Sequence, residues 1–174
     1  IRGMNLKATI IQFRPELGDL RGNISRLDRR FDEVGGSGLV VLPELASSGY
    51  AFRDAAEAFL SSEELSDSEY VDFLMRKSKE KDVFIVSGIN ERAGARLFNS
   101  SILVGPDGIL ARYRKMHLFM NEKDIFQPGD GDLPVVDLGG YTVGMMICFD
   151  YLFPEPWRAM AVKGADVICH PSNL

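Results

Sequence analysis

The sequence predicts a single-domain α/β fold. Short apolar, β-rich stretches alternate along the chain with segments whose apolar residues recur at helical spacing. One stretch, Leu39–Leu42, is apolar at every position, which is typical of a strand buried on both faces. The 174 residues correspond to one domain, and a hydrophobic content of 45% is enough for a sizeable core. We expect the strands to share a doubly wound sheet with helices on its faces.

The N-terminal part predicts a strand, a helix and a second strand. Leu6–Phe13 is rich in β-forming residues and is followed by turn residues, so it predicts the first strand. Asn23–Val34 predicts a helix, because its apolar residues fall on one face. The glycine run Gly35–Gly38 ends this helix before the Leu39–Leu42 strand. Since a phosphate-binding loop instead follows a strand and opens a helix, we exclude nucleotide binding there.

The middle of the chain predicts a helix, a strand and a hairpin. Ser47–Asp67 is expected to be an irregular, partly helical stretch over the edge of the sheet. Ser68 or the residue before it can cap a helix that runs to about Lys81. The predicted strands are Val83–Gly88 and the two arms of a β-hairpin around Pro106-Asp107-Gly108, Phe98–Val104 and Ile109–Tyr113.

The C-terminal part predicts a long loop, a second hairpin and a strand-to-helix elbow. His117–Pro134 has few regular signals, so we expect an active-site loop or a surface excursion. Pro154 suits the first turn of a helix, which continues over Trp157–Gly164. The predicted strands are Val135–Leu138 and Tyr141–Ile147, which form a hairpin around Gly139-Gly140, and Val167–His170.

Composition limits the classes of partner. The net charge is -5 and the pI is about 5.1, and we find no Lys/Arg cluster of the size that nucleic acid binding requires. Two cysteines make no disulfide framework, and with His117 and His170 they do not form a zinc spacing, so we expect no metal and a reducing, cytoplasmic setting. No apolar run approaches the length of a membrane span. A small molecule is the expected partner.

Three chemically useful residues each follow a different predicted strand. Glu44, Lys115 and Cys148 lie just past strand ends, and the carboxyl ends of strands in such a sheet gather at one edge, where ligands bind. Each also has an ordinary interpretation: Glu44 as a solvated loop acid, Lys115 as an exposed cation and Cys148 as a small buried hydrophobe. Their shared placement raises the weight of the functional interpretation.

The chemistry of these groups suggests a separate role in catalysis for each of them. A free thiol has a pKa of roughly 8.5, so Cys148 needs a neighbour to become a nucleophile. Lys115 favours the thiolate and Glu44 opposes it, and the two effects nearly cancel. We therefore expect Cys148 to pass its proton to Glu44 as it attacks. Lys115 and a backbone N–H near Phe149 are then free to stabilise the oxyanion that develops.

The motifs around these residues carry a resemblance to a known family. They are LPELASSGY around Glu44, YRKMHLF around Lys115, GMMICFDYLFPE around Cys148 and HPSNL at the end. In this order and spacing they resemble the nitrilase superfamily of carbon–nitrogen hydrolases across nearly the whole chain. The resemblance implies a Glu44–Lys115–Cys148 triad, with Glu122 orienting the substrate and the lysine.

The resemblance also implies a fold, a reaction and an assembly. The fold would be a four-layer α-β-β-α sandwich spanning residues 1–174, with its C-terminal part apparently missing. The reaction would convert a small amide or nitrile to a carboxylic acid and ammonia through a thioester on Cys148, without metal or organic cofactor. Members of the family commonly pair through the helix after the cysteine, here Glu155–Lys163, so a homodimer or larger homo-oligomer is expected.

Several alternatives remain open. The pocket wall is expected among aromatic residues that could equally be plain core, namely Tyr50, Phe52, Phe126, Phe149 and Trp157. Cys169 is interpreted as structural. The substrate could also be an N-carbamoyl compound. An isochorismatase-like hydrolase also uses a cysteine, an acid and a lysine, but the two predicted hairpins disfavour it, and a catalytically silent α/β module that acts through its dimer surface is the non-enzymatic alternative.

Overall fold

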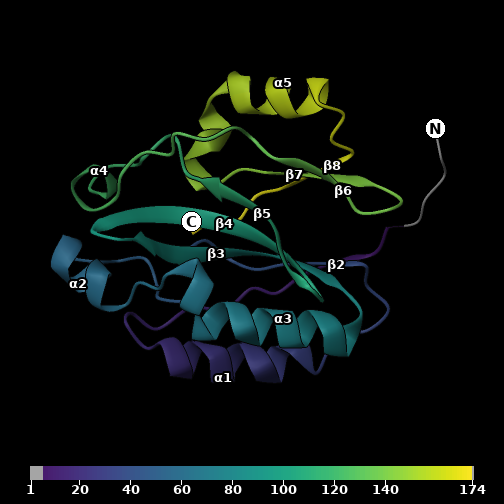
Figure 1. Cartoon of the computed structure of the whole chain (residues 1–174), viewed down its shortest axis with the longest axis horizontal. Coiled ribbons are helices and arrows are strands. Elements are labelled where there is room, and N and C mark those ends of the chain that lie inside the picture. Colours follow the sequence, from purple (N-terminus) through teal and green to yellow (C-terminus); the bar gives the residue numbers. More distant parts are fainter. Residues whose placement is uncertain (1–5, 174) are drawn as a thin grey trace.

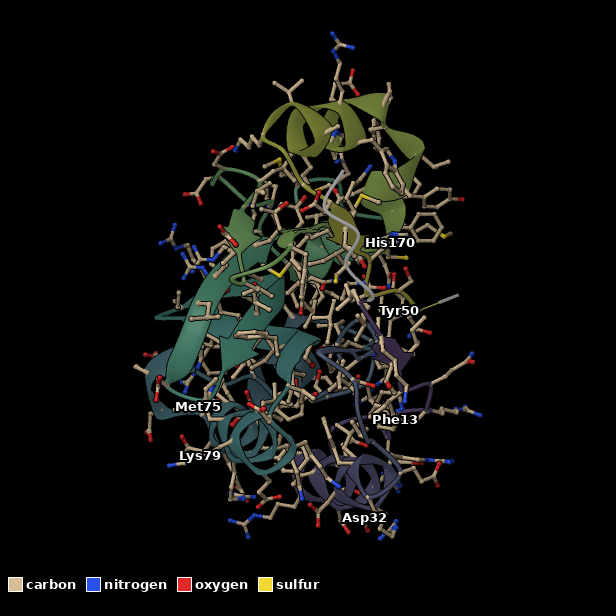
Figure 2. The ribbon with its side chains drawn as sticks, turned by 90° about the vertical axis from the view of Figure 1, so that its right-hand side faces the viewer. Phe13, Asp32, Tyr50, Met75, Lys79 and His170 are labelled. Atoms are coloured by element: carbon tan, nitrogen blue, oxygen red, sulfur yellow. The ribbon has the colours of Figure 1, made fainter. Side chains whose placement is uncertain are left out.

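The computed structural model describes residues 6–173 and has four layers (Figure 1). Two helices cover the outer face of a five-stranded sheet, a three-stranded sheet packs on its other face, and one helix covers the second sheet. In the view turned by 90°, Asp32 and Lys79 mark the two-helix layer at the opposite end of the molecule from the single helix (Figure 2). The predicted α-β-β-α sandwich is confirmed.

The five-stranded sheet has the order β1-β2-β3-β4-β5. β1, β2 and β3 are parallel, whereas β4 is antiparallel to both β3 and β5. β5 therefore runs in the same direction as β2, and both end at the same edge of the sheet. The strands are β1 (Ala8–Ile10), β2 (Leu39–Val41), β3 (Phe84–Ala93), β4 (Arg96–Gly105) and β5 (Gly108–Arg114).

β3 is longer than predicted, and it forms with β4 a hairpin that the sequence analysis did not predict. The strand expected to end at Gly88 continues to Ala93, and Gly94 turns the chain with φ +61°. Asn90 and Glu91 are polar, but both are buried and have partners in the structure. The Asn90 amide donates to the carbonyl of Ala58, and Glu91 accepts hydrogen bonds from two arginines of β5.

The two-helix layer comprises α1 (Leu20–Phe31) and α3 (Glu69–Lys81). α1 begins earlier than predicted, because the Asp19 side chain caps it by accepting a hydrogen bond from the Gly22 N–H. α3 begins after the predicted cap Ser68, whose Oγ accepts from the Val71 N–H. The irregular stretch before it contains α2 (Ala55–Leu60) and the 3-10 helix η1 (Leu65–Asp67).

The three-stranded sheet is separate from the first, so one doubly wound sheet was the wrong expectation. β7 pairs antiparallel with β6 and parallel with β8. Apolar side chains from both sheets form a common core between them, which is why two layers are stable together. The elements are α4 (Glu122–Ile125), β6 (Val135–Asp137), β7 (Thr142–Met145), η2 (Cys148–Leu152), α5 (Pro154–Val162) and β8 (Val167–Cys169). No helix within residues 6–173 has the length and apolar character needed to cross a bilayer.

Candidate active site

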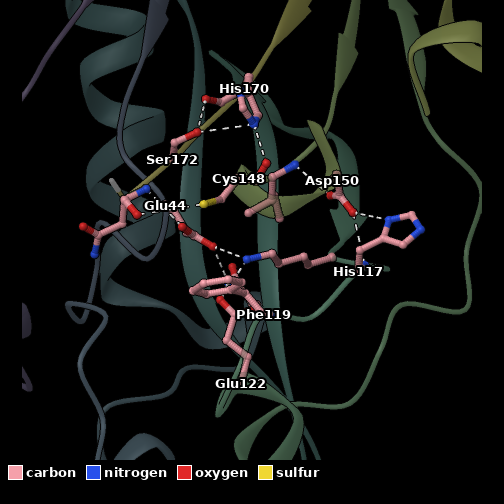
Figure 3. Close-up of polar contacts among 12 residues, drawn as sticks. Glu44, His117, Phe119, Glu122, Cys148, Asp150, His170 and Ser172 are labelled. Atoms are coloured by element: carbon pink, nitrogen blue, oxygen red, sulfur yellow. Dashed lines mark hydrogen bonds and ion pairs between the residues drawn. The ribbon is translucent and has the colours of Figure 1, made fainter. Parts of the chain in front are cut away.

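Glu44, Lys115 and Cys148 lie together although they come from both sheets (Figure 3). Glu44 follows β2, Lys115 follows β5 directly, and Cys148 begins η2 just after β7. The expectation that strand ends converge therefore holds in a two-sheet arrangement. The core between the sheets brings the end of β7 beside the ends of β2 and β5.

Lys115 is enclosed by two carboxylates. Its Nζ donates to Glu44 Oε1 at 2.7 Å and to Glu122 Oε1 at 2.8 Å. The exposed fraction of the side chain is 0% for Lys115 and Glu44 and 3% for Glu122. A solvated loop acid and an exposed cation are therefore the wrong descriptions of these residues. A buried cluster of two carboxylates and one ammonium carries an excess negative charge.

Glu122 is the first residue of α4, inside the segment predicted to be a loop. Its Oε2 accepts a hydrogen bond from the Phe119 N–H at 2.7 Å, so the backbone before α4 fixes the direction of this carboxylate. Lys115 takes the other oxygen, Oε1. The long segment between β5 and β6 is thus anchored at the site.

Asn99 is the site residue that the sequence analysis missed. Its Nδ2 donates to Glu44 Oε1 at 2.8 Å and to Glu122 Oε1 at 3.2 Å, and its backbone carbonyl accepts from the Lys115 N–H at 2.8 Å. It lies inside β4 and is fully buried. The other site residues follow strand ends, whereas Asn99 lies within a strand, so the strand-end pattern does not mark it. The available signal was an amide side chain inside a strand buried on both faces.

Cys148 lies on a strained elbow. Its φ is +37°, a left-handed conformation that non-glycine residues rarely adopt and that costs on the order of 1–3 kcal/mol. Its backbone N–H donates to the Pro171 carbonyl at 2.9 Å. The Sγ lies 3.9 Å from the Asn173 carbonyl oxygen, and the Asn173 N–H donates to Glu44 Oε2 at 3.0 Å. The Asn173 backbone thus contacts both the Cys148 thiol and Glu44 Oε2.

Asp150 ties the elbow to the strand that presents Lys115. This fully buried carboxylate accepts from the Ile147 N–H at 2.9 Å, the Tyr113 hydroxyl at 2.8 Å and the His117 N–H at 3.1 Å. The His117 ring nitrogen Nδ1 also lies 2.7 Å from Asp150 Oδ1. Tyr113 and His117 flank Lys115 in the sequence, so one side chain fixes the nucleophile segment relative to the lysine segment.

The environment keeps the thiol protonated at neutral pH. Burial and then the Glu44 charge raise the pKa of Cys148 to about 11, although the Asn173 backbone and Lys115 oppose the change. Burial also raises the pKa of Glu44, against the effect of Lys115. For Lys115, burial lowers the pKa, but the Glu44 and Glu122 carboxylates outweigh it and the net change is upward. Lys115 is therefore a permanent ammonium, and Glu44 is a more basic carboxylate than usual.

A cleft of about 750 Å³ opens at Glu44. Tyr50 and Asn173 also line it, together with the Gln12–Leu17 segment after β1. Burial, followed by the nearby Glu122 and Glu44 carboxylates and Cys148, raises the pKa of Tyr50, so its hydroxyl stays protonated beside the site. Of the aromatic residues expected in the pocket wall, only Tyr50 is among the described residues that line this cleft.

The other predicted pocket residues lie elsewhere. Phe52 and Phe126 are both buried and pack edge to face, with ring centroids 6.2 Å apart, in a hydrophobic cluster. Trp157 lies on α5 and donates its Nε1–H to the Tyr151 carbonyl. Phe149 is half-buried, and its ring packs against Phe119 at 4.9 Å. Its backbone N–H lies in the first turn of η2, where helical N–H groups lack partners within the helix.

Cys169 differs from Cys148 in its contacts. It is the last residue of β8, is buried in the core between the sheets, and burial raises the pKa of its thiol to about 12. Both cysteines are free. Within residues 6–173, no three His, Cys, Asp or Glu side chains are placed to share a metal ion.

The fold and these motifs define a class of protein. A family model described as carbon-nitrogen hydrolase matches residues 7–174, and the chain belongs to this family. Among similar curated proteins, a nitrilase of Pyrococcus abyssi is 43% identical over 97% of this chain, and an (R)-stereoselective amidase of Pseudomonas sp is 36% identical over 94% of it. The matches cover 65% and 58% of those proteins, so the chain spans less than two thirds of their length.

Solved structures share the fold. An amidase from Nesterenkonia sp. superposes with a TM-score of 0.80 at 25% identity, and the match covers 100% of this chain and 67% of that one. A CN-hydrolase superfamily protein from Xanthomonas campestris gives a TM-score of 0.84 at 24% identity, over 97% of this chain and 65% of that one. The resemblance drawn from the sequence motifs is confirmed at the level of family and fold.

Proposed function

We propose that this protein hydrolyses the carbon–nitrogen bond of a small amide or nitrile, with Glu44, Lys115 and Cys148 as its catalytic residues. The observation that carries the proposal is the buried Glu44–Lys115 pair beside a protonated thiol, with Glu44 also lining a cleft. A stable ion pair alone gives no reason for a cysteine on a strained elbow next to it.

The reaction follows from the position of each group. Cys148 Sγ attacks the amide carbon while its proton passes to Glu44, and the tetrahedral oxyanion that forms is stabilised by Lys115 and the Phe149 N–H. Glu44 then gives the proton to the departing nitrogen, so ammonia leaves and a thioester remains. Water attacks the thioester with Glu44 as base, which releases the carboxylic acid and restores the thiol. A nitrile consumes one further water before the thioester stage.

A raised pKa for the thiol fits this order of events. Because Cys148 is protonated at rest, the base must act during the attack rather than before it. Glu44 suits that task, since burial makes it more basic and Lys115 holds it in place. Glu122 holds Lys115 from the other side and orients it toward the developing oxyanion. The scheme requires no metal or organic cofactor.

The second candidate substrate is an N-carbamoyl compound. An N-carbamoylputrescine amidase of Arabidopsis thaliana is 29% identical over 90% of this chain. The same residues would attack the carbamoyl carbon and release ammonia, so the two candidates share their chemistry. We favour an amide or nitrile of a small aliphatic acid, because the similar proteins named above are a nitrilase and an amidase.

The proposal extends to assembly and setting. We propose a homodimer or larger homo-oligomer that pairs through α5. Tyr151 and Leu152 before this helix, and Trp157 and Val162 on it, are large apolar side chains left exposed. A cytoplasmic setting fits the two free thiols.

Ammonia release from a panel of amides, nitriles and N-carbamoyl compounds tests the proposal in the full gene product. We expect turnover of at least one class and an acyl adduct on Cys148 by mass spectrometry after rapid quenching. No ammonia from any class, with no adduct on Cys148, would leave the catalytically silent α/β module as the better description.

A further inference from the structure

We propose that Asn99 is a positioning residue of this reaction, whose side-chain amide holds Glu44 and Glu122 on one ammonium and keeps Glu44 an anionic base directed at Cys148. The inference rests on the proposed function and adds a residue to it. Asn99 is fully buried inside β4, so it acts through the two carboxylates rather than by touching substrate.

The charges of the site make such a residue necessary. Lys115 supplies one positive charge to two carboxylates, and burial raises the pKa of Glu44. The groups that face Glu44 are Lys115, Glu122, Tyr50 and Cys148, and only Lys115 is a cation. Backbone N–H groups of Asn173 and Phe119 reach Oε2 of Glu44 and of Glu122, so the two Oε1 atoms receive their hydrogen bonds from Lys115 and Asn99. A protonated Glu44 could not accept the proton of the thiol.

Asn99 supplies a donor without adding charge. One Nδ2 group carries two hydrogens, and it reaches Glu44 Oε1 at 2.8 Å and Glu122 Oε1 at 3.2 Å. Both carboxylates thus receive a hydrogen bond that stabilises their ionised forms. Glu44 Oε2 accepts a hydrogen bond from the Asn173 N–H instead, and the Asn173 carbonyl oxygen lies beside the Cys148 Sγ. Lys115 and Asn99 thus hold Oε1 of Glu44, and the Asn173 N–H holds Oε2.

The two carboxylates determine the orientation of the Asn99 amide. A flipped amide would place its oxygen against two carboxylate oxygens, so repulsion determines which end faces Glu44. In the observed orientation, Asn99 Oδ1 is buried and has no hydrogen-bond partner within residues 6–173. An unsatisfied buried acceptor lowers stability.

Asn99 also fixes the position of Lys115. Its backbone carbonyl accepts from the Lys115 N–H at 2.8 Å, where β4 ends its pairing with β5. The Asn99 carbonyl therefore positions the backbone of Lys115, and the Asn99 amide positions the two carboxylates that bind the Lys115 Nζ. A shift of Asn99 would move all three charged groups.

The neighbouring strand offers a matched control. Asn90 is the partner of Asn99 across the β3–β4 ladder and is equally buried, with its Oδ1 also lacking a partner in the described part of the chain. Its Nδ2 donates to the Ala58 carbonyl at 2.7 Å and to Ser61 Oγ, not to a carboxylate. Asn90→Leu therefore repeats the loss of a buried amide without removing a donor from the site.

The test compares pH profiles of Asn99→Leu, Asn90→Leu and the parent full gene product. We expect the acidic limb of kcat/KM to move upward by about one pH unit in Asn99→Leu, because Glu44 loses a donor to its ionised form, with kcat reduced about tenfold at low pH. KM should stay within about twofold, because Asn99 does not reach substrate. Asn90→Leu should keep the parent profile. Equal profiles for Asn99→Leu and Asn90→Leu, or a loss confined to KM, would overturn the inference.

A second variant tests the inference if Asn99→Leu folds poorly, and a measurement without substrate separates it from the proposed function. Asn99→Asp keeps the shape but replaces the donors by a third acid, and we expect an equal or larger upward shift; a profile that superposes on the parent contradicts the inference. The pH dependence of Cys148 alkylation by iodoacetamide, followed on the Cys148 peptide, needs no substrate. Its acidic limb should move upward in Asn99→Leu alone. Absence of ammonia release from the parent protein refutes the proposed function, whereas an unchanged alkylation profile refutes the role of Asn99.

Discussion

The backbone of Glu44 lies directly against Gly88 of β3. A Cβ at position 88 would lie 2.6 Å from the Glu44 Cα and 2.4 Å from the Leu45 backbone nitrogen. The Gly88 N–H also donates to the Pro43 carbonyl at 3.1 Å, and Leu45 has a φ of +48°. Glu44 is therefore presented by a bend in the chain that fits over a position without a side chain.

Gly88→Ala should reduce ammonia release by up to about a hundredfold, because backbone atoms must shift and carry the Glu44 carboxylate with them. Steady-state kinetics on the full gene product measures this loss. Gly35→Ala is the control, since its added Cβ meets nothing within 4 Å and Gly35 is exposed. If Gly88→Ala and Gly35→Ala have the same activity, the close approach does not set the position of Glu44.

Replacement of Cys148 by Ala should abolish ammonia release, because no other group in the scheme can form the thioester. Cys169→Ala should leave most of the activity and lower only stability, since Cys169 is a core residue of the second sheet. The assay is ammonia production by both variants at matched folded concentration. The reverse pattern would falsify the choice of nucleophile.

The thiol of Cys148 should titrate far above neutral pH. Its pKa is raised to about 11 by burial and by the Glu44 charge, so at pH 7 only about one molecule in ten thousand carries a thiolate there. The ultraviolet absorbance of the thiolate, taken as the difference between the parent and Cys148→Ala, should therefore stay flat through neutrality and rise toward pH 11. A difference signal already complete at neutral pH would mean a resting thiolate and would remove the need for Glu44 as base.

Tyr113→Phe should lower both stability and activity. The substitution removes the hydroxyl that donates to the buried Asp150, a bond to a charged group worth about 1.5–3 kcal/mol. Asp150 keeps its bonds to Ile147 and His117, so kcat should fall only several-fold. Urea unfolding and kinetics are the two measurements.

Tyr70→Phe provides the comparison for that prediction. Tyr70 is also fully buried, but its hydroxyl bonds to Ser87 Oγ at 2.8 Å in the core against the helix layer. Tyr70→Phe should lower the free energy of unfolding and leave kcat unchanged. A loss of kcat that simply follows stability in both variants would show that the Asp150 network does not position the site.

Local patterns predicted most of the secondary structure and the three strand-end residues. The helical spacing before Gly35 and the apolar run Leu39–Leu42 depend only on residues close together in the sequence, so they can be interpreted without knowledge of the fold. β3 was predicted too short: it continues through the polar residues Asn90 and Glu91, whose partners lie far away in the chain. The same limitation hid Asn99, whose carboxylate partners lie 55 and 23 positions away.

The sequence by itself determined the family, the alternation of strands and helices, and the fact that an acid, a lysine and a cysteine each follow a strand. Only the tertiary structure decided which strand ends of the two sheets meet, that Asn99 joins both carboxylates to Lys115, and that Asp150 holds the cysteine segment to the lysine segment. The physical reason is the separation of the interacting residues along the sequence. Strand and helix patterns arise from residues a few positions apart, whereas Glu44 and Lys115 are 71 positions apart and meet only when the core between the sheets is packed.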